Sequence, residues 1–258
     1  SRTPAAGAVN MNSRMAHLGN AYGGTASYGS GNLMRGTIDL NRQVGDSSAV
    51  RLNFMMQQRD DIPERDHQDG SRWGIAPSFS LGLGRDVTFS LQYLHYQYDQ
   101  ATDTGFPIVT QPGQVRATAP TEYGLRRANW YGIANDRDKV QLDRITARLQ
   151  WKATDWLTLY NDTRLSFLDR DFAYTILSCT GTCATNFFNG VQPATYAVSG
   201  AGAPYSQYTW GGQNVTTGVA RFNTGVPDNH VPADAPLITA PRLVELSFQT
   251  AGLWEAGT

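Results

Sequence analysis

Side chains that could do acid–base or nucleophilic chemistry are present, but they do not stand in catalytic patterns. The sequence contains neither Gly-x-Ser-x-Gly nor His-Glu-x-x-His, and its acidic pairs, Asp60–Asp61 and Asp169 with Asp171, fall where solvated carboxylates are routine. Nothing supplies a nucleophile, a base and an orienting partner together. We therefore expect no enzyme, although a secreted enzyme on a β scaffold is one alternative class.

The histidines and cysteines do not suggest a metal site. The four histidines, at positions 17, 67, 95 and 230, are scattered, and Cys179 and Cys183 have no histidine near them. Both cysteines lie in a run rich in Thr, Gly and Asn, where a small disulfide-closed loop is favoured over free thiols. A disulfide would require an oxidising compartment such as the periplasm or the cell surface.

The composition is typical of an extended β protein. Only 17% of the 258 residues are charged, 11% are aromatic and 26 are glycine. The net charge of −1 gives no reason to expect nucleic acid as a partner, because nucleic acid favours a basic face. No stretch of ~18 apolar residues predicts a transmembrane helix. The mean hydropathy of −0.40 still permits a membrane barrel, in which polar and apolar residues alternate.

Alternation with a period of two is the dominant pattern along the chain. In the run 50–58, Val50, Leu52 and Phe54 fall on one face, whereas Arg51 and Asn53 fall on the other. Similar runs, each near the ~9–11 residues of a tilted transmembrane strand, predict about eight strands. These runs are 20–28, 34–41, 50–58, 73–83, 87–93, 145–151, 157–167 and 244–249. Alternation alone also fits a soluble β-sandwich with one solvated face.

The connections favour a membrane barrel. Tight hairpin signals stand at Gly45–Asp46, 84–86 and 153–155, whereas residues 60–71, 100–138 and 172–241 form long connections. Short turns at one end and long loops at the other are typical of outer-membrane barrels. Aromatic residues stand near strand ends, where interfacial girdles are expected: Tyr93, Tyr96, Tyr98, Trp151 and Trp156. For His95 we expect a place in the girdle or the barrel wall.

Two stretches resemble the TonB-dependent receptors. Residues 2–14, with Gly7, Val9, Asn10, Ser13 and Arg14, are similar to the end of the plug domain, although Thr3 and Ala6 replace expected glycines. The motifs 28–30, 35–37, 39–41, 51–53, 72–78, 81–84 and 90–94 resemble the first barrel hairpins of ferric-siderophore receptors, and most closely those of the catecholate branch.

This resemblance implies an all-β, antiparallel up-and-down transmembrane barrel, present here as a partial barrel of about eight strands with long extracellular loops. Residues 1–16 would be the C-terminal end of the plug, and residues 17–258 the N-terminal part of the barrel. We expect an internal piece of a longer receptor, with the TonB-contacting segment outside this sequence. The partners implied are a ferric siderophore, the TonB complex and outer-membrane lipid; no cofactor is expected, because iron arrives in the siderophore complex.

The ligand of such a receptor, a ferric catecholate, is anionic and aromatic, which suits arginine and stacking rings. The connection 100–138 holds the favoured candidates, which are Phe106, Tyr123, Arg126, Arg127, Trp130 and Tyr131. The alternative is that these side chains pack the loop on itself. A complete eight-stranded outer-membrane barrel with a structural or adhesion role, and a soluble lectin-like module, remain as other functional classes.

Overall fold

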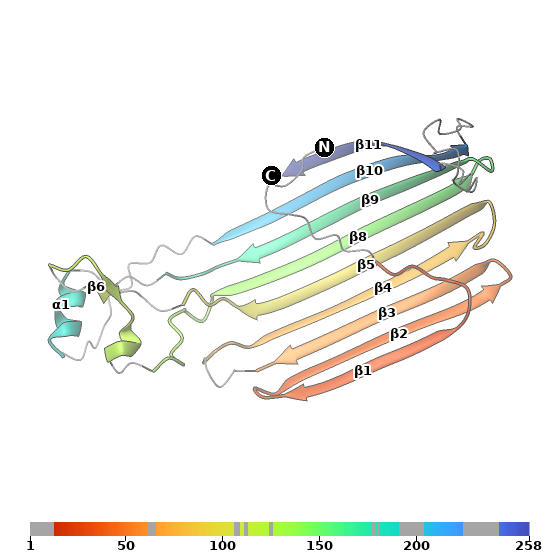
Figure 1. Cartoon of the computed structure of the whole chain (residues 1–258). Coiled ribbons are helices and arrows are strands. Elements are labelled where there is room, and N and C mark those ends of the chain that lie inside the picture. Colours follow the sequence, from red (N-terminus) through yellow and green to blue (C-terminus); the bar gives the residue numbers. More distant parts are fainter. Residues whose placement is uncertain are drawn as a thin grey trace, which may run out of the picture.

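The computed structural model shows one open, curved antiparallel sheet (Figure 1). It describes residues 13–60, 66–105, 109–110, 113–123, 126–176, 179, 181–190, 204–223 and 243–257. Neighbouring strands follow the order β1-β2-β3-β4-β5-β8-β9-β10-β11. Their bounds are Ala21–Gly29, Leu33–Gly45, Ser48–Arg59, Gly70–Leu81, Val87–Ala101, Arg137–Lys152, Leu157–Phe172, Tyr205–Asn223 and Leu243–Gly257.

The strand count and one loop assignment differ from the sequence-based prediction. Among the described residues the sheet has nine strands, where about eight were expected. The additional strand is β10, which lies inside the connection 172–241 that was predicted as a single loop. Its glycines at 211, 212 and 218 interrupt the alternation of large and polar residues, and this interruption hides the strand.

The sheet does not close on itself. Within the described part of the chain, β1 pairs only with β2 and β11 pairs only with β10, so these two strands stand at opposite ends of the strand order. The closed eight-stranded barrel is therefore not the arrangement observed. Short turns join β2–β3, β4–β5 and β8–β9 at one end of the sheet, as expected, whereas β10 and β11 are joined there by the longer stretch 224–242.

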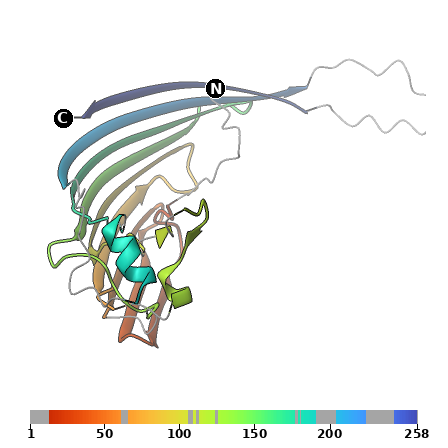
Figure 2. The same cartoon turned by 90° about the vertical axis from the view of Figure 1, so that its left-hand side faces the viewer.

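The two faces of the sheet differ in polarity. The exposed large apolar residues of the strands lie, by register, almost entirely on the convex face, and they include Ile38, Leu40, Phe79, Ile145 and Leu165. The concave face, visible in Figure 2, carries the buried polar residues of the sheet: Asn41, Arg51, Ser78, Ser80, Ser90, Gln92, Asp138 and Thr146. This distribution is that of a barrel whose outside meets lipid and whose inside is polar.

The segment before β1 is bound to the concave face. Asn41, which is fully buried, donates from Nδ2 to the carbonyl oxygens of His17 and Gly19 at 2.9 and 2.7 Å. Arg51 donates to the Met15 carbonyl at 3.2 Å, and Ser80 Oγ donates to the Ala16 carbonyl at 2.9 Å. These bonds satisfy backbone groups of a segment without secondary structure, and they attach residues 15–19 to β2, β3 and β4.

One polar cluster interrupts the apolar convex face. We call it the Asn–Thr quartet: Asn161 and Thr163 on β9, with Asn214 and Thr216 on β10. Asn161 Nδ2 donates to Asn214 Oδ1 and Thr216 Oγ1, and Asn214 Nδ2 donates to Asn161 Oδ1 and Thr163 Oγ1, at 2.7–3.2 Å. The hydroxyls of Thr163 and Thr216 donate to the two amide oxygens. Every side-chain donor in the quartet is therefore used inside it.

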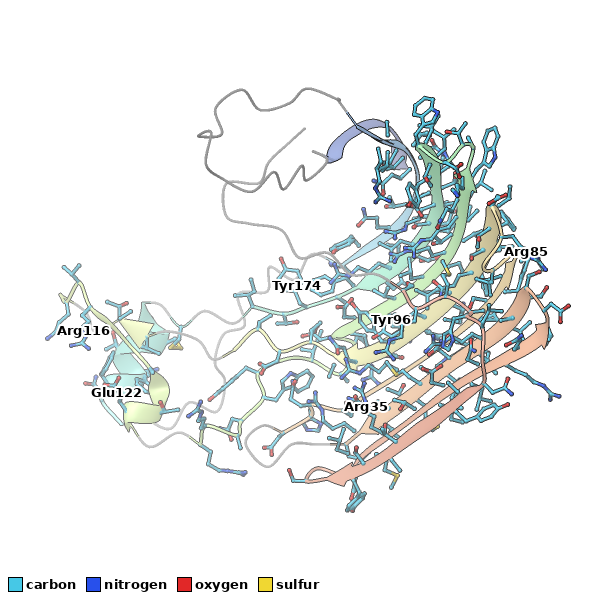
Figure 3. The ribbon with its side chains drawn as sticks, turned by 45° about the vertical axis from the view of Figure 1, so that its right-hand side comes forward. Arg35, Arg85, Tyr96, Arg116, Glu122 and Tyr174 are labelled. Atoms are coloured by element: carbon cyan, nitrogen blue, oxygen red, sulfur yellow. A yellow bond between two sulfur atoms is a disulfide. The ribbon has the colours of Figure 1, made fainter. Side chains whose placement is uncertain are left out.

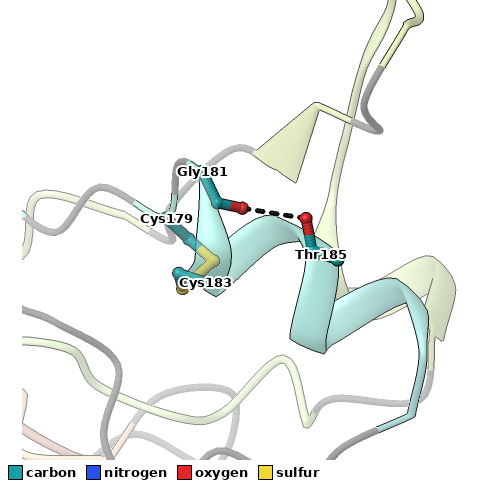
Figure 4. The surroundings of a disulfide bond; sticks show 4 residues. All are labelled: Cys179, Gly181, Cys183 and Thr185. Carbon is teal, nitrogen blue, oxygen red and sulfur yellow. Dashed lines mark hydrogen bonds between the residues drawn. A yellow bond between two sulfur atoms is a disulfide. The ribbon is translucent and has the colours of Figure 1, made fainter.

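Beyond the strand ends, parts of two loops pack together into a small cap (Figure 1). It contains β6 (Val109–Thr110), β7 (Ala117–Thr118), a 3-10 turn (Pro120–Tyr123) and α1 (Thr182–Phe188). Val109 pairs with Cys179, and both are buried with Ala184. Cys179 and Cys183, the pair predicted to be joined, form a disulfide at the start of α1, where Thr185 also donates to the Gly181 carbonyl (Figure 4).

Among the described residues, no helix is long and apolar enough to cross a membrane.

Candidate ligand-binding wall

A row of paired residues crosses the concave face near the long-loop end. By register, Arg35 on β2 stands opposite Gln57, Gln57 opposite Arg72, and Arg72 opposite Tyr98 on β5. The row continues through Val140 on β8 to Arg170 on β9 and Gln207 on β10. We call these seven residues the outer row. Neighbouring strands lie ~4.8 Å apart, so its three arginines span about 24 Å of wall.

Arg170 is the most firmly held member of the outer row. Its Nε and Nη2 donate to the two oxygens of Asp138 at 2.8 and 3.0 Å, and its Nη1 donates to the Tyr205 hydroxyl at 3.0 Å. The guanidinium carbon lies 4.5 Å from the centre of the Phe172 ring. Tyr98 donates to the same Asp138 at 3.0 Å. The bidentate ion pair and the neighbouring rings hold this guanidinium in place, and the carboxylate of Asp138 neutralises its positive charge.

Arg35 and Arg72 form a different kind of arginine site. Arg35 Nη1 and Arg72 Nη2 donate to the same atom, Gln57 Oε1, at 3.2 and 2.9 Å. Both arginines are exposed, and neither has a carboxylate partner among the described residues. Two positive charges therefore share one neutral acceptor. Most of their N–H groups remain available to an anion in the lumen.

The described part of the concave face is cationic. Across the described side chains of β1 to β10, the acidic residues on this face are Asp39, Asp138 and Asp162, and each is paired with its own arginine: Arg51, Arg170 and Arg148. Besides Arg35 and Arg72, the face carries Arg144 and Arg164 without a described carboxylate partner. The excess charge would attract an anion entering from the long-loop end.

Tyr96 and Tyr98 were assigned to an interfacial girdle, and this assignment is wrong. Register places both on the concave face, with ring centres 6.1 Å apart, whereas Tyr93 lies on the convex face with His95. The two tyrosines alternate with Tyr93 by sequence parity, so they had to face away from it. With Phe172 and Tyr205 they give the wall an aromatic surface beside its arginines.

The loop candidates lie above this wall and are partly engaged in holding the loop. Trp130 Nε1 donates to the Thr102 carbonyl at 2.9 Å, and the Trp130 ring packs on His67 at 5.2 Å. Arg126 is exposed, with its Nη2 3.8 Å from Asp66. Arg127 and Tyr131 follow in the same loop, Tyr123 ends the 3-10 turn, and Phe106 lies outside the described residues. Their role in binding stays a prediction.

The arginines of the outer row were not recognised from the sequence. Arg35 was placed on the polar face of its run, Arg72 only within a motif that resembles the receptors, and Arg170 lay beyond the run 157–167. Their position in the strands could have identified them, because Arg35, Arg72 and Arg170 all stand two or three residues from the long-loop end of a strand. Counted from the short-turn end of each strand, Arg35 and Arg72 lie ten and nine residues away and Arg170 thirteen, so the complete row follows only from the register of the sheet.

Known proteins similar to this chain are receptors. The catecholate siderophore receptor Fiu of Escherichia coli K12 is 34% identical over 182 residues, which cover 68% of this chain and 24% of Fiu. The probable TonB-dependent receptor BfrD of Bordetella pertussis Tohama I is 36% identical over 129 residues, 49% of this chain and 17% of BfrD. The chain therefore spans about a quarter or less of the length of these relatives. No protein-family model matches it.

Solved structures agree in fold. The closed form of the ferric-catecholate import receptor Fiu from E. coli K12 matches with a TM-score of 0.68 at 29% identity, over 85% of this chain and 31% of that one. The siderophore receptor PiuA from Acinetobacter baumannii matches with a TM-score of 0.66 at 22% identity, over 83% and 29%, which supports the fold alone. From its open antiparallel sheet, its polar concave wall and these relatives, we conclude that the chain belongs to the TonB-dependent siderophore receptors of the bacterial outer membrane.

Proposed function

We propose that this chain is part of a longer receptor that takes up a ferric siderophore, and that the outer row is one wall of its binding site. Residues 1–16 would end the plug, and residues 17–258 would begin the barrel. The relatives support a longer receptor, because each matches the chain over only part of its own length. The TonB complex would act on the plug from the periplasm, and the iron would arrive as cargo without a resident cofactor.

The ligand that the wall favours is anionic and carries aromatic donor groups. The observation that carries this proposal is the pair of exposed arginines, Arg35 and Arg72, which share the single acceptor Gln57. A ferric catecholate has negative charge for these guanidinium groups and flat rings for Tyr96 and Tyr98. A neutral ferric hydroxamate offers neither feature to the same degree.

The test is a fluorescence-quenching titration of the full-length receptor with a ferric tris-catecholate. We expect Arg35→Gln with Arg72→Gln to weaken binding by about tenfold for each arginine, because a hydrogen bond to a charged group contributes roughly 1.5 kcal/mol. Arg85→Gln is the matched control, since Arg85 lies in the β4–β5 turn at the other end of the sheet (Figure 3). Equal affinity of the double variant and the control would contradict the proposed wall.

The loop site is tested separately with Arg126→Ala combined with Arg127→Ala. If these arginines contact the ligand, the combined change lowers the affinity for the ferric catecholate. Its effect on the binding free energy then adds to the effect of the wall variants. Unchanged affinity would remove the loop arginines from the site and leave the wall proposal intact.

A further inference from the structure

A groove on the convex face lies among β1 to β5. It has a volume of about 680 Å³, and its apolar lining includes Leu40, Leu52, Pro77, Phe79 and Leu91. Register places these side chains on the face that turns away from the lumen. The volume falls in the ~300–1,000 Å³ range of sites that hold small molecules.

Pro77 explains why the face is hollowed here. Proline has no backbone N–H to donate to a neighbouring strand. The pairing of β4 with β5 accordingly passes from Ile75–His95 to Ser78–Gln92 without the two positions between them. By register Pro77 stands opposite Leu52 on β3 and on the same face as Phe79 of its own strand, and its short ring fills less space than either of these groove-lining side chains.

One cation stands at the edge of this groove. Arg42 lies on β2 near the short turn that leads to β3, and it is exposed on the convex face. It is the one charged residue on the convex face of β1 to β4 among the described residues, and it has no ion-pair partner there. An arginine at the border of a lipid-facing surface is costly unless its head reaches an anion or the interface.

We propose that this groove binds a phospholipid of the periplasmic leaflet, with an acyl chain over Pro77 and an anionic headgroup phosphate on Arg42. The short-turn end of an outer-membrane barrel faces the periplasm, so Arg42 lies at the depth of the headgroups on that side. Its planar guanidinium suits a phosphate, and its carbon stem follows the apolar wall. This site goes beyond the proposed function: it rests on the membrane location of the sheet and not on the ligand in the lumen.

The experiment is native mass spectrometry of the full-length receptor in detergent, titrated with phosphatidylglycerol or with zwitterionic phosphatidylcholine. We expect the receptor to retain phosphatidylglycerol in preference to phosphatidylcholine. Arg42→Gln should weaken phosphatidylglycerol retention by about fivefold, the size expected for one cation at an anionic lipid surface. Arg42→Lys should keep part of the preference.

Two further variants separate a site from general attraction. Arg85→Gln removes a positive charge at the same end of the sheet but outside the groove, and it should leave retention unchanged. Leu91→Trp, which fills the groove, should lower retention of both lipids; circular dichroism and heat-modified gel mobility check that it folds. The proposal is overturned if Arg42→Gln and wild type retain phosphatidylglycerol equally, if Arg85→Gln lowers retention as much as Arg42→Gln, or if the wild type does not distinguish the two lipids.

Discussion

The Asn–Thr quartet gives the sharpest prediction about what stabilises the sheet. Leu157 and Phe167 stand near the two apolar borders of β9, ten residues apart, and Asn161 and Thr163 lie between them. At ~3.3 Å per residue and a tilt near 40°, those ten residues span roughly 25 Å, the height of the apolar band. The quartet therefore lies near the middle of the lipid-facing surface, where an unpaired polar group has no water to bind.

The perturbation is a double-mutant cycle on Asn161→Ala and Asn214→Ala. These two amides exchange two hydrogen bonds, each 3.2 Å long. At about 0.6–1 kcal/mol for each side-chain bond in a membrane, the coupling energy should be about 1–2 kcal/mol. The change in lipid transfer energy of each single substitution cancels in the cycle, so the coupling reports the interaction alone.

The assay is equilibrium urea unfolding of the full-length receptor in lipid vesicles, followed by tryptophan fluorescence. The control cycle combines Asn214→Ala with Asn53→Ala, because Asn53 lies on the concave face of β3, several strands away. That pair should be additive to within about 0.5 kcal/mol. A coupling below that value for Asn161 and Asn214 would refute the claim that the quartet is a closed network in the folded membrane protein.

The remaining predictions concern the anchored segment, the outer row and the cap. Arg51→Ala should speed protease cleavage within residues 13–19, measured by gel, because Arg51 binds the Met15 carbonyl; cleavage at the wild-type rate would count against the anchor. Arg170→Ala should lower the free energy of unfolding by roughly 3 kcal/mol, since the buried Asp138 loses its ion pair, and adding Asp138→Asn should recover part of this loss. Replacing both cysteines by serine should raise cleavage at 181–190 and leave the urea midpoint of the sheet unchanged; a shifted midpoint would show that the cap supports the sheet.

Alternation and turn residues predicted most of the sheet because both are local. The runs at 50–58 and 157–167 lie inside observed strands, and the run at 73–83 extends two residues beyond the end of β4 at Leu81. β10 was missed because glycines occupy several positions of its two faces, so the period of two loses its large residues. Its assignment depends on pairing with β9 along its length, which is a long-range property.

The candidate site was harder to predict for the same reason. Arg35, Gln57, Arg72 and Arg170 come from four strands, and only the register of the sheet puts them in one row. The loop residues Arg126 and Trp130 were predicted because arginines and aromatic residues stand within six positions of each other at 126–131. The structure shows Trp130 bonded to Thr102 within the loop itself, a contact that sequence spacing does not reveal.

The measurement that tests the central claim most directly is iron uptake by living cells. The full-length receptor would be expressed in an iron-starved bacterium lacking its own catecholate receptors, and radioactive iron would be supplied as a tris-catecholate or as a neutral hydroxamate complex. The account predicts accumulation from the catecholate alone, loss of accumulation without TonB, and reduced accumulation with Arg35→Gln and Arg72→Gln. Equal uptake from both complexes, or uptake that persists without TonB, would contradict it.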